Sequence, residues 1–84
     1  MAQDEAVAGI KGLEIYPNPV RNELYIVSGE DLSGGIVQVY DMSGRQVLRG
    51  KPVSNRVDVS RLTAGTYTLI YTKDRKSVTK RFVK

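Results

Sequence analysis

Short runs of alternating apolar and polar residues recur about every ten residues along the chain, with turn-forming residues between them. This period of two places alternate side chains on the inner and outer faces of a strand. Its clearest inward-facing sets are Leu24/Ile26, Val37/Val39, Val57/Val59 and Tyr67/Leu69/Tyr71. Strands are predicted at 12–16, 23–28, 35–41, 45–50, 55–59, 66–73 and 76–83. Since no window has the helical period, we predict an all-β fold, an immunoglobulin-like antiparallel β-sandwich of about seven strands.

A proline-flanked asparagine interrupts this pattern early, in the run Tyr16, Pro17, Asn18, Pro19. Proline lacks an amide N–H and fixes φ, and it drives the residue before it toward extended geometry. The run is therefore too rigid for a helix and too poor in donors for a central strand. We interpret it as a corner, at which a peripheral strand leaves its sheet and the next strand begins. Its expected role is that of a scaffold and not of a binding surface.

The segment VDVSRLTAGTYTL, residues 57–69, carries the most specific structural signal. Leu62 is placed to enter the core, Gly65 allows a tight reversal, and Tyr67 opens the next strand. Immunoglobulin-like sandwiches use such a tyrosine to bond back to the backbone just upstream, in a tyrosine corner. The alternative is that Tyr67 only fills the core. Both interpretations give Tyr67 a structural role.

Two further turns differ in the strength of their signal. The sequence Asp41–Met42–Ser43–Gly44 suits a turn whose last residue has positive φ, which glycine adopts without strain. The turn at Asp74–Arg75 is a weaker hairpin signal, because it contains no glycine.

The size and composition of the chain fit one small domain. It has 84 residues, an apolar share of 40% and no cysteine, so packing and backbone ladders must stabilise the fold. The absence of cysteine permits folding in reducing and oxidising compartments alike. No run reaches the length of a membrane span, and the signal peptide of an exported chain would lie upstream. We expect residues 1–11 to be a flexible leader and residues 12–84 the folded domain.

Charge is distributed unevenly along the chain. The net charge of +4 is composed of −4 in residues 1–31, +3 in residues 32–72 and +5 in residues 73–84. A basic end of this density suits nucleic acid, an anionic lipid surface or an acidic protein receptor, or it is only a solvated edge. The aromatic residues fall mainly on the apolar phase of their strands and are interpreted as core, so we do not expect nucleic-acid binding.

Residues suited to catalysis are scarce. The chain has no histidine, which rules out histidine-based triads and removes the commonest nitrogen ligand of zinc. An S-x-x-K match at Ser77 and Lys80 requires a helix, whereas on a strand these residues point to opposite faces. The acids Glu30, Asp31 and Asp41 leave open a calcium loop. We expect no enzyme activity, no cofactor and no catalytic residue.

Four motifs taken together in order, namely LEIYPNPV–RNELYI, VQVYDMSGRQV, VDVSRLTAGTYTL and the terminal KRFVK, resemble the C-terminal sorting domain (type A) of type IX (Por) secretion system cargo proteins of Bacteroidetes. The resemblance runs from about Leu13 to Lys84. It implies a domain at the end of a larger exported protein that is recognised in the periplasm and directs its cargo through an outer-membrane translocon. The implied partners are the translocon, its shuttle proteins and a sortase-like signal peptidase. The cargo would then reach the cell surface, joined to lipopolysaccharide, or the medium.

Position by position, the resemblance assigns structural roles to the corner at Tyr16, Pro17, Asn18 and Pro19, to the turn glycine Gly44, and to Leu62, Ala64, Gly65 and Tyr67. It assigns translocon recognition to the terminal residues Lys80, Arg81, Phe82, Val83 and Lys84. Asp74–Arg75 departs from the glycine-bearing turn of the family. We expect the terminal segment to add little to stability beyond Val78 and Phe82, and Lys80 to guard an edge strand that a receptor can extend.

Two other functions remain open. An immunoglobulin-like adhesion or carbohydrate-binding module would share the sandwich, and it should expose aromatic residues on one sheet. A structural end-cap of an exported enzyme would need the fold but not the last five residues.

Overall fold

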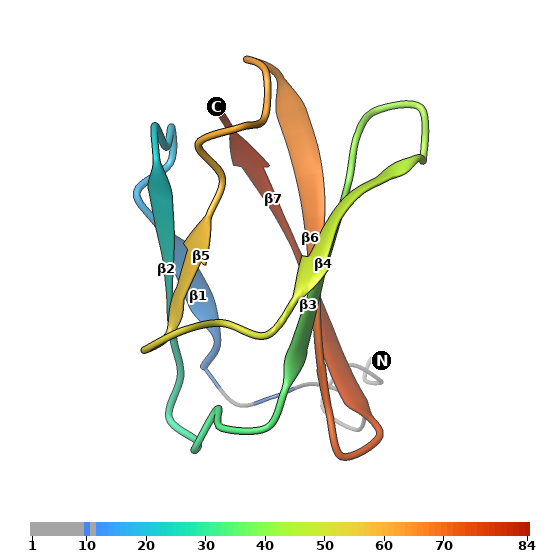
Figure 1. The fold of residues 1–84 in the computed structure, drawn as a ribbon. Helices are drawn as coiled ribbons and strands as arrows, with labels where there is room; N and C mark the ends of the chain where they lie inside the picture. Colours follow the sequence, from blue (N-terminus) through green and yellow to red (C-terminus); the bar gives the residue numbers. More distant parts are fainter. Residues whose placement is uncertain (1–9, 11) are drawn as a thin grey trace, which may run out of the picture.

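Two antiparallel sheets pack face to face in the computed structural model, which describes residue 10 and residues 12–84 (Figure 1). Their strands are β1 (Glu14–Tyr16), β2 (Glu23–Val27), β3 (Ile36–Tyr40), β4 (Gln46–Gly50), β5 (Arg56–Asp58), β6 (Thr66–Lys73) and β7 (Lys76–Val83). The described residues form no helix, and so none that is long and apolar enough to cross a membrane. The predicted all-β sandwich of seven strands is confirmed.

Every pairing within the two sheets is antiparallel. One sheet has the order β1-β2-β5 and the other the order β4-β3-β6-β7. The strands β1 and β7 are therefore edge strands, and they lie beside each other at one open side of the sandwich. The expected departure of the first strand from its sheet is wrong, because β1 and β2 pair with each other and Tyr16 lies opposite Tyr25.

The core is the space between the sheets, filled by the inward phase of each strand. Its fully buried side chains include Leu24 and Ile26 from β2, Val39 from β3, and Leu69, Tyr71 and Phe82 from β6 and β7. Ile10 is also buried against this core, although the sequence analysis placed it in the leader. The rest of the proposed leader, residues 1–9 and 11, lies outside the described residues.

Gly35 shows why one position of the core must be glycine. A Cβ at this position would overlap the ring and the hydroxyl of Tyr71. That hydroxyl is buried and donates a hydrogen bond to the carbonyl of Leu32, and burial raises the pKa of Tyr71 above its ordinary value. The phenol of Tyr71 therefore occupies the space that a side chain at position 35 would need, and its hydrogen bond anchors the connection between β2 and β3.

Both predicted hairpins form. In the first, Gly44 has φ of +87°, and Asp41 Oδ1 accepts hydrogen bonds from the amides of Ser43 and Arg45 at 3.0 Å each. In the second, Asp74 and Arg75 both have positive φ, at +50° and +69°, and Lys73 pairs with Lys76. This is the backbone of a two-residue type I′ turn, which matches the twist of the strands without a glycine.

The tyrosine corner is confirmed. The hydroxyl of Tyr67 donates a hydrogen bond of 2.5 Å to the carbonyl of Thr63, four residues upstream. Leu62 packs against the core from the same turn, and its amide donates to the carbonyl of Val59 at 3.0 Å. The phenol ring itself is buried, so Tyr67 supports the core and fixes the connection from β5 to β6.

A turn with the sequence D-x-S occurs three times among the described residues. In each copy the aspartate Oδ1 accepts a hydrogen bond from the serine amide two residues later, at 2.9 or 3.0 Å. Hydrogen bonds hold the pKa of each aspartate below its ordinary value, chiefly from the Ser33 amide at Asp31, the Arg45 amide at Asp41 and the Ser60 hydroxyl at Asp58, with help from nearby cations. The aspartates are Asp31, Asp41 and Asp58, and each stabilises a turn that leads out of or into a strand.

Candidate recognition site at the C-terminal strand

The strand β7 presents two faces of different character at the edge of the four-stranded sheet. Its inward phase contains Val78, Lys80 and Phe82, and its outward phase contains Ser77, Thr79, Arg81 and Val83. The residues assigned to translocon recognition, 80–84, are therefore divided between the interior and the surface. Only part of this segment is accessible to a partner while the domain is folded.

Phe82 belongs to the scaffold. Its side chain is fully buried, and its ring stacks on Tyr67 with a centroid distance of 5.4 Å. The two residues lie opposite each other in the register of β6 and β7. A receptor can reach Phe82 only after β7 has left the sheet.

The lysines near the end of the chain bind acidic or carbonyl groups of the same molecule. Lys80 Nζ lies 3.5 Å from Glu14 Oε1, and Lys76 Nζ lies 3.5 Å from Glu30 Oε1. The Lys73 ammonium donates to the backbone carbonyl of Asp31. Through these contacts, acidic residues from the first third of the chain lie beside basic residues from its last twelve.

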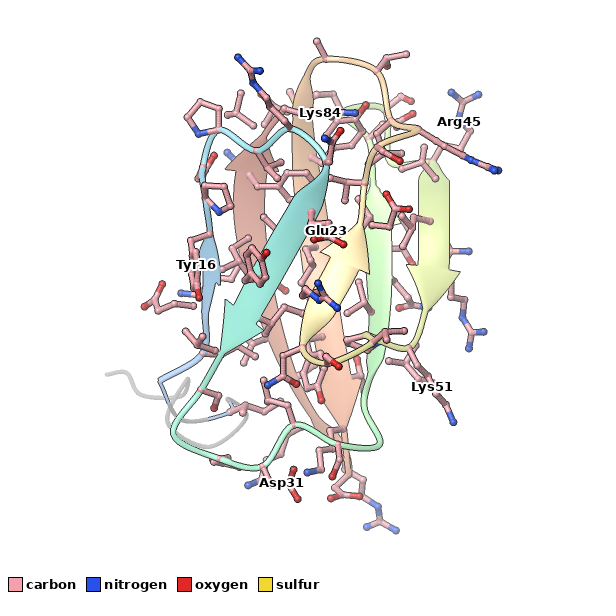
Figure 2. The ribbon with its side chains drawn as sticks, turned by 60° about the vertical axis from the view of Figure 1, so that its left-hand side comes forward. Tyr16, Glu23, Asp31, Arg45, Lys51 and Lys84 are labelled. Carbon is pink, nitrogen blue, oxygen red and sulfur yellow. The ribbon has the colours of Figure 1, made fainter. Side chains whose placement is uncertain are left out.

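Lys84 makes the most extensive contacts of the terminal segment. Its ammonium donates hydrogen bonds to the carbonyls of Val59, Ser60 and Leu62 at 2.9, 2.9 and 2.6 Å. Its backbone pairs with Gly65 in both directions, at 2.8 and 2.9 Å. These contacts count against the expectation that the terminal segment adds little to the fold, because Lys84 joins the β5–β6 connection to the end of β7 (Figure 2).

The proline corner holds the same strand from the other side. Asn18 Oδ1 accepts a hydrogen bond of 2.8 Å from the Val83 amide, and Asn18 Nδ2 donates a weaker one of 3.4 Å to the Arg81 carbonyl. The Val20 amide donates to the Val83 carbonyl at 2.8 Å. The peptide bonds before Pro17 and Pro19 are both cis. The corner is thus a scaffold, and the group that it positions is the end of β7.

What remains accessible on β7 is its outward phase and part of its edge. Arg81 is exposed and Val83 retains 42% of its accessible surface. Gly65 and Lys84 form a hydrogen-bonded pair, and such pairs alternate with non-hydrogen-bonded pairs along an antiparallel ladder. Ser77 and Thr79 belong to pairs of the second kind, so their backbone N–H and C=O groups point away from β6. Lys80 faces inward at this edge, where the sequence predicts a residue that guards against unwanted strand pairing. The uncovered edge therefore lies at Ser77–Thr79 and not at the terminal residues.

The calcium loop that the sequence left open does not form. Asp31 lies at the opposite end of the molecule from Arg45, whose guanidinium is 3.3 Å from Asp41 (Figure 2). Asp31 and Asp41 therefore cannot share a calcium ion, and that interpretation is wrong. Within the described residues no three carboxylates gather as a metal site. Ser77 and Lys80 point to opposite faces of β7, as predicted.

Two tyrosines form a pair on the outside of the sandwich, although the aromatic residues were interpreted mainly as core. Tyr16 and Tyr25 stand opposite each other on the outer face of the three-stranded sheet, with ring centroids 5.4 Å apart. Tyr16 is 48% exposed. Beside the pair, Pro17, Pro19 and Arg21 line a shallow hollow of about 690 Å³. The strand phase alone could have predicted this placement, because Tyr16 and Tyr25 alternate with the inward-facing Ile15, Leu24 and Ile26.

The chain is similar to a known protein family and to a solved structure. Residues 14–84 match the family model described as the secretion system C-terminal sorting domain. The chain is also similar to a solved structure of PorZ, described as an essential bacterial surface component of the type IX secretion system of Porphyromonas gingivalis, with a TM-score of 0.66 and 25% identity. The match covers 86% of this chain and 11% of the PorZ chain.

A comparison with curated proteins gave no match. The family model nevertheless covers every strand of both sheets, together with the proline corner and the tyrosine corner. The family is one of sorting signals and not of enzymes. The chain belongs to the secretion system C-terminal sorting domain family, and it is a C-terminal signal for type IX secretion that sends its cargo out of the cell.

Proposed function

We propose that residues 12–84 are the sorting unit of a larger exported protein and that residues 1–11 connect it to the cargo. The unit is recognised in the periplasm and directs the cargo through the outer-membrane translocon of the type IX system. The family match over residues 14–84 carries this proposal. The likeness to PorZ, whose description places it in the same secretion system, supports it.

Recognition acts on the folded strand β7, through the exposed Arg81 and Val83. The contacts described above support this choice, because Lys80, Phe82 and Lys84 are engaged within the molecule. A receptor that adds a strand would pair with the uncovered edge at Ser77–Thr79. Phe82 and Lys84 serve recognition by holding Arg81 and Val83 in place.

Partners act in order along this route. Shuttle proteins and the translocon bind the folded domain, and a sortase-like signal peptidase then cuts in the connecting segment, residues 1–11. The cargo is joined to lipopolysaccharide at the cell surface or released to the medium. The domain itself performs no catalysis, in keeping with the absence of histidine and cysteine from the whole chain.

The test is a periplasmic reporter fused upstream of the 84-residue chain, expressed in a bacterium with the type IX system and in a sister strain that lacks the translocon. We expect reporter at the cell surface or in the medium of the first strain only. Mass spectrometry of the exported reporter should place its new C-terminus within residues 1–11. Reporter that remains in the periplasm of both strains contradicts the proposal.

The tyrosine pair favours one second function, a carbohydrate-binding module. Exposed aromatic residues on one sheet are the mark that this alternative requires, and Tyr16 with Tyr25 provides them. Tyrosine rings bind the apolar faces of sugars, and Arg21 beside the hollow can bind hydroxyl or acidic groups. Binding of polysaccharide that is lost on Tyr16→Ser, with export unchanged, would assign this function to the outer face of β1 and β2.

A further inference from the structure

The outer face of the four-stranded sheet is free of acidic residues. None of the strands β3, β4, β6 and β7 contains an aspartate or a glutamate. The centre of this face is formed by Gln38 and Tyr40 of β3 and by Thr68 and Ile70 of β6, each of them half-buried. We call this surface, together with its flanking arginines Arg49 and Arg81, the four-stranded outer face.

Arg49 and Arg81 lie at opposite margins of this face, and both are exposed. Arg49 pairs with Gln38, Gln38 with Ile70, and Ile70 with Thr79, in a row across the four strands. Arg81 lies two residues beyond Thr79 on β7. Strand spacing and rise place the two residues about 15 Å apart. Neither guanidinium has an ion-pair partner among the described residues.

Four cations elsewhere on the domain are paired with carboxylates, whereas the two arginines on this face are not. Arg45 contacts Asp41 and Arg56 contacts Glu23, while the lysines at 76 and 80 contact glutamates. The outer face of the other sheet has the opposite character, since it carries Glu14, Glu23 and Asp58 beside Arg56. The sandwich therefore has one acidic and one basic outer face.

The composition of the four-stranded outer face is that of a docking surface. Protein interfaces have a centre depleted of charge and are enriched in tyrosine and arginine. Here Tyr40 lies between two unpaired arginines on a face without acids. Strand spacing and rise give the face about 400 Å², roughly half of what one partner buries in a stable complex. Such an area suits a partner that binds briefly and then releases.

We propose that the four-stranded outer face docks an acidic protein surface of the secretion machinery, with Arg49 and Arg81 each facing a carboxylate. This inference rests on the proposed function and extends recognition from the edge of β7 to the whole sheet. The free charge on this face is positive at both margins, so the complementary partner carries carboxylates about 15 Å apart. In this proposal Arg49 helps to select the partner, although it lies about thirty residues before the terminal segment in the sequence.

The test measures binding of the 84-residue chain to envelope membranes from a bacterium with the type IX system. The test variant is R49E/R81E, and the charge-matched control is R61E/R75E, which changes two exposed arginines outside this face. We expect the test variant to bind about tenfold more weakly and the control to stay near wild type. Binding of the wild type should weaken as salt rises, because exposed charges are screened.

Three results would overturn the inference: equal binding of R49E/R81E and the control, no wild-type binding to the membranes, or equally strong wild-type binding to protein-free vesicles with anionic lipid. The last would make the occupant a lipid. Melting curves verify folding, and R49Q/R81Q replaces the test variant if the glutamates unfold it. In the export assay, normal export of R49E/R81E contradicts this inference together with the role of Arg81 in recognition, whereas failure of wild-type export contradicts the sorting function itself.

Discussion

Replacement of Lys84 by methionine removes the ammonium that binds three carbonyls and keeps most of the aliphatic stem. The carbonyls of Val59 and Leu62 are partly buried, and that of Ser60 is exposed and can turn to water. A hydrogen bond to a charged group contributes about 1.5–3 kcal/mol, and a buried acceptor left alone costs about 1–3 kcal/mol. Since one ammonium serves all three and water replaces part of the loss, we expect K84M to lose about 2–3 kcal/mol of unfolding free energy.

That loss is large for a domain whose whole stability lies at about 5–15 kcal/mol. It corresponds to a fall of roughly 10–20 °C in the melting temperature of a chain of this size. The assay is urea unfolding followed by tyrosine fluorescence and far-UV circular dichroism, since the chain contains five tyrosines and no tryptophan. The slope of the unfolding free energy against urea should not change, because the same surface is exposed on unfolding.

The control is K80M, the same change four residues earlier on the same face of β7. Lys80 has one contact at 3.5 Å, to Glu14, and the Glu14 side chain is 69% exposed. Exposed ion pairs contribute about 0–1 kcal/mol, so K80M should be close to wild type. If K84M is no less stable than K80M, then the three carbonyl contacts do not stabilise the fold and the reasoning is refuted.

Other residues give predictions of the same kind. Y67F should lose about 0.5–1.5 kcal/mol of unfolding free energy, measured by urea, because Thr63 loses the phenol bond; an unchanged midpoint would make Tyr67 core filler only. G35A should lower the melting temperature more than G50A, since a Cβ at Gly50 meets open space; equal effects would contradict the contact with Tyr71. Acid should destabilise the domain, because carboxyls with lowered pKa stabilise the fold fully above their unfolded pKa of about 4 and lose this effect as pH falls through their folded values. Urea midpoints that stay constant down to about pH 2 would contradict this account of Asp31, Asp41 and Asp58.

Local patterns were enough to predict the strands. Apolar alternation at Leu24/Ile26 and Val37/Val39 placed β2 and β3 within one or two residues, because one face of each strand is buried. The turn at Gly44 could also be predicted from its own residues, since glycine adopts a φ of +87° without strain. These features depend on a few neighbouring residues, and the sequence displays them directly.

Long-range contacts could not be predicted in the same way. The bond from Val83 to Asn18 joins residues 65 positions apart, and that from Lys84 to Leu62 joins residues 22 apart. Neither polar side chain has a periodicity that indicates its partner. The terminal basic residues therefore resembled a free signal, whereas in the structure the Lys84 ammonium binds three backbone carbonyls and Arg81 is exposed.

The most direct test of this account compares two charge reversals on neighbouring residues of β7. R81E changes the outward face, and K80E changes the inward edge beside Glu14. The measurement is the fraction of a fused reporter at the cell surface or in the medium of a bacterium with the type IX system, for variants whose melting curves show a folded domain. We predict that R81E leaves most of the reporter in the periplasm and that K80E exports it as the wild type does. Export of both variants, or a block in K80E alone, would contradict recognition through the outward face of the folded terminal strand.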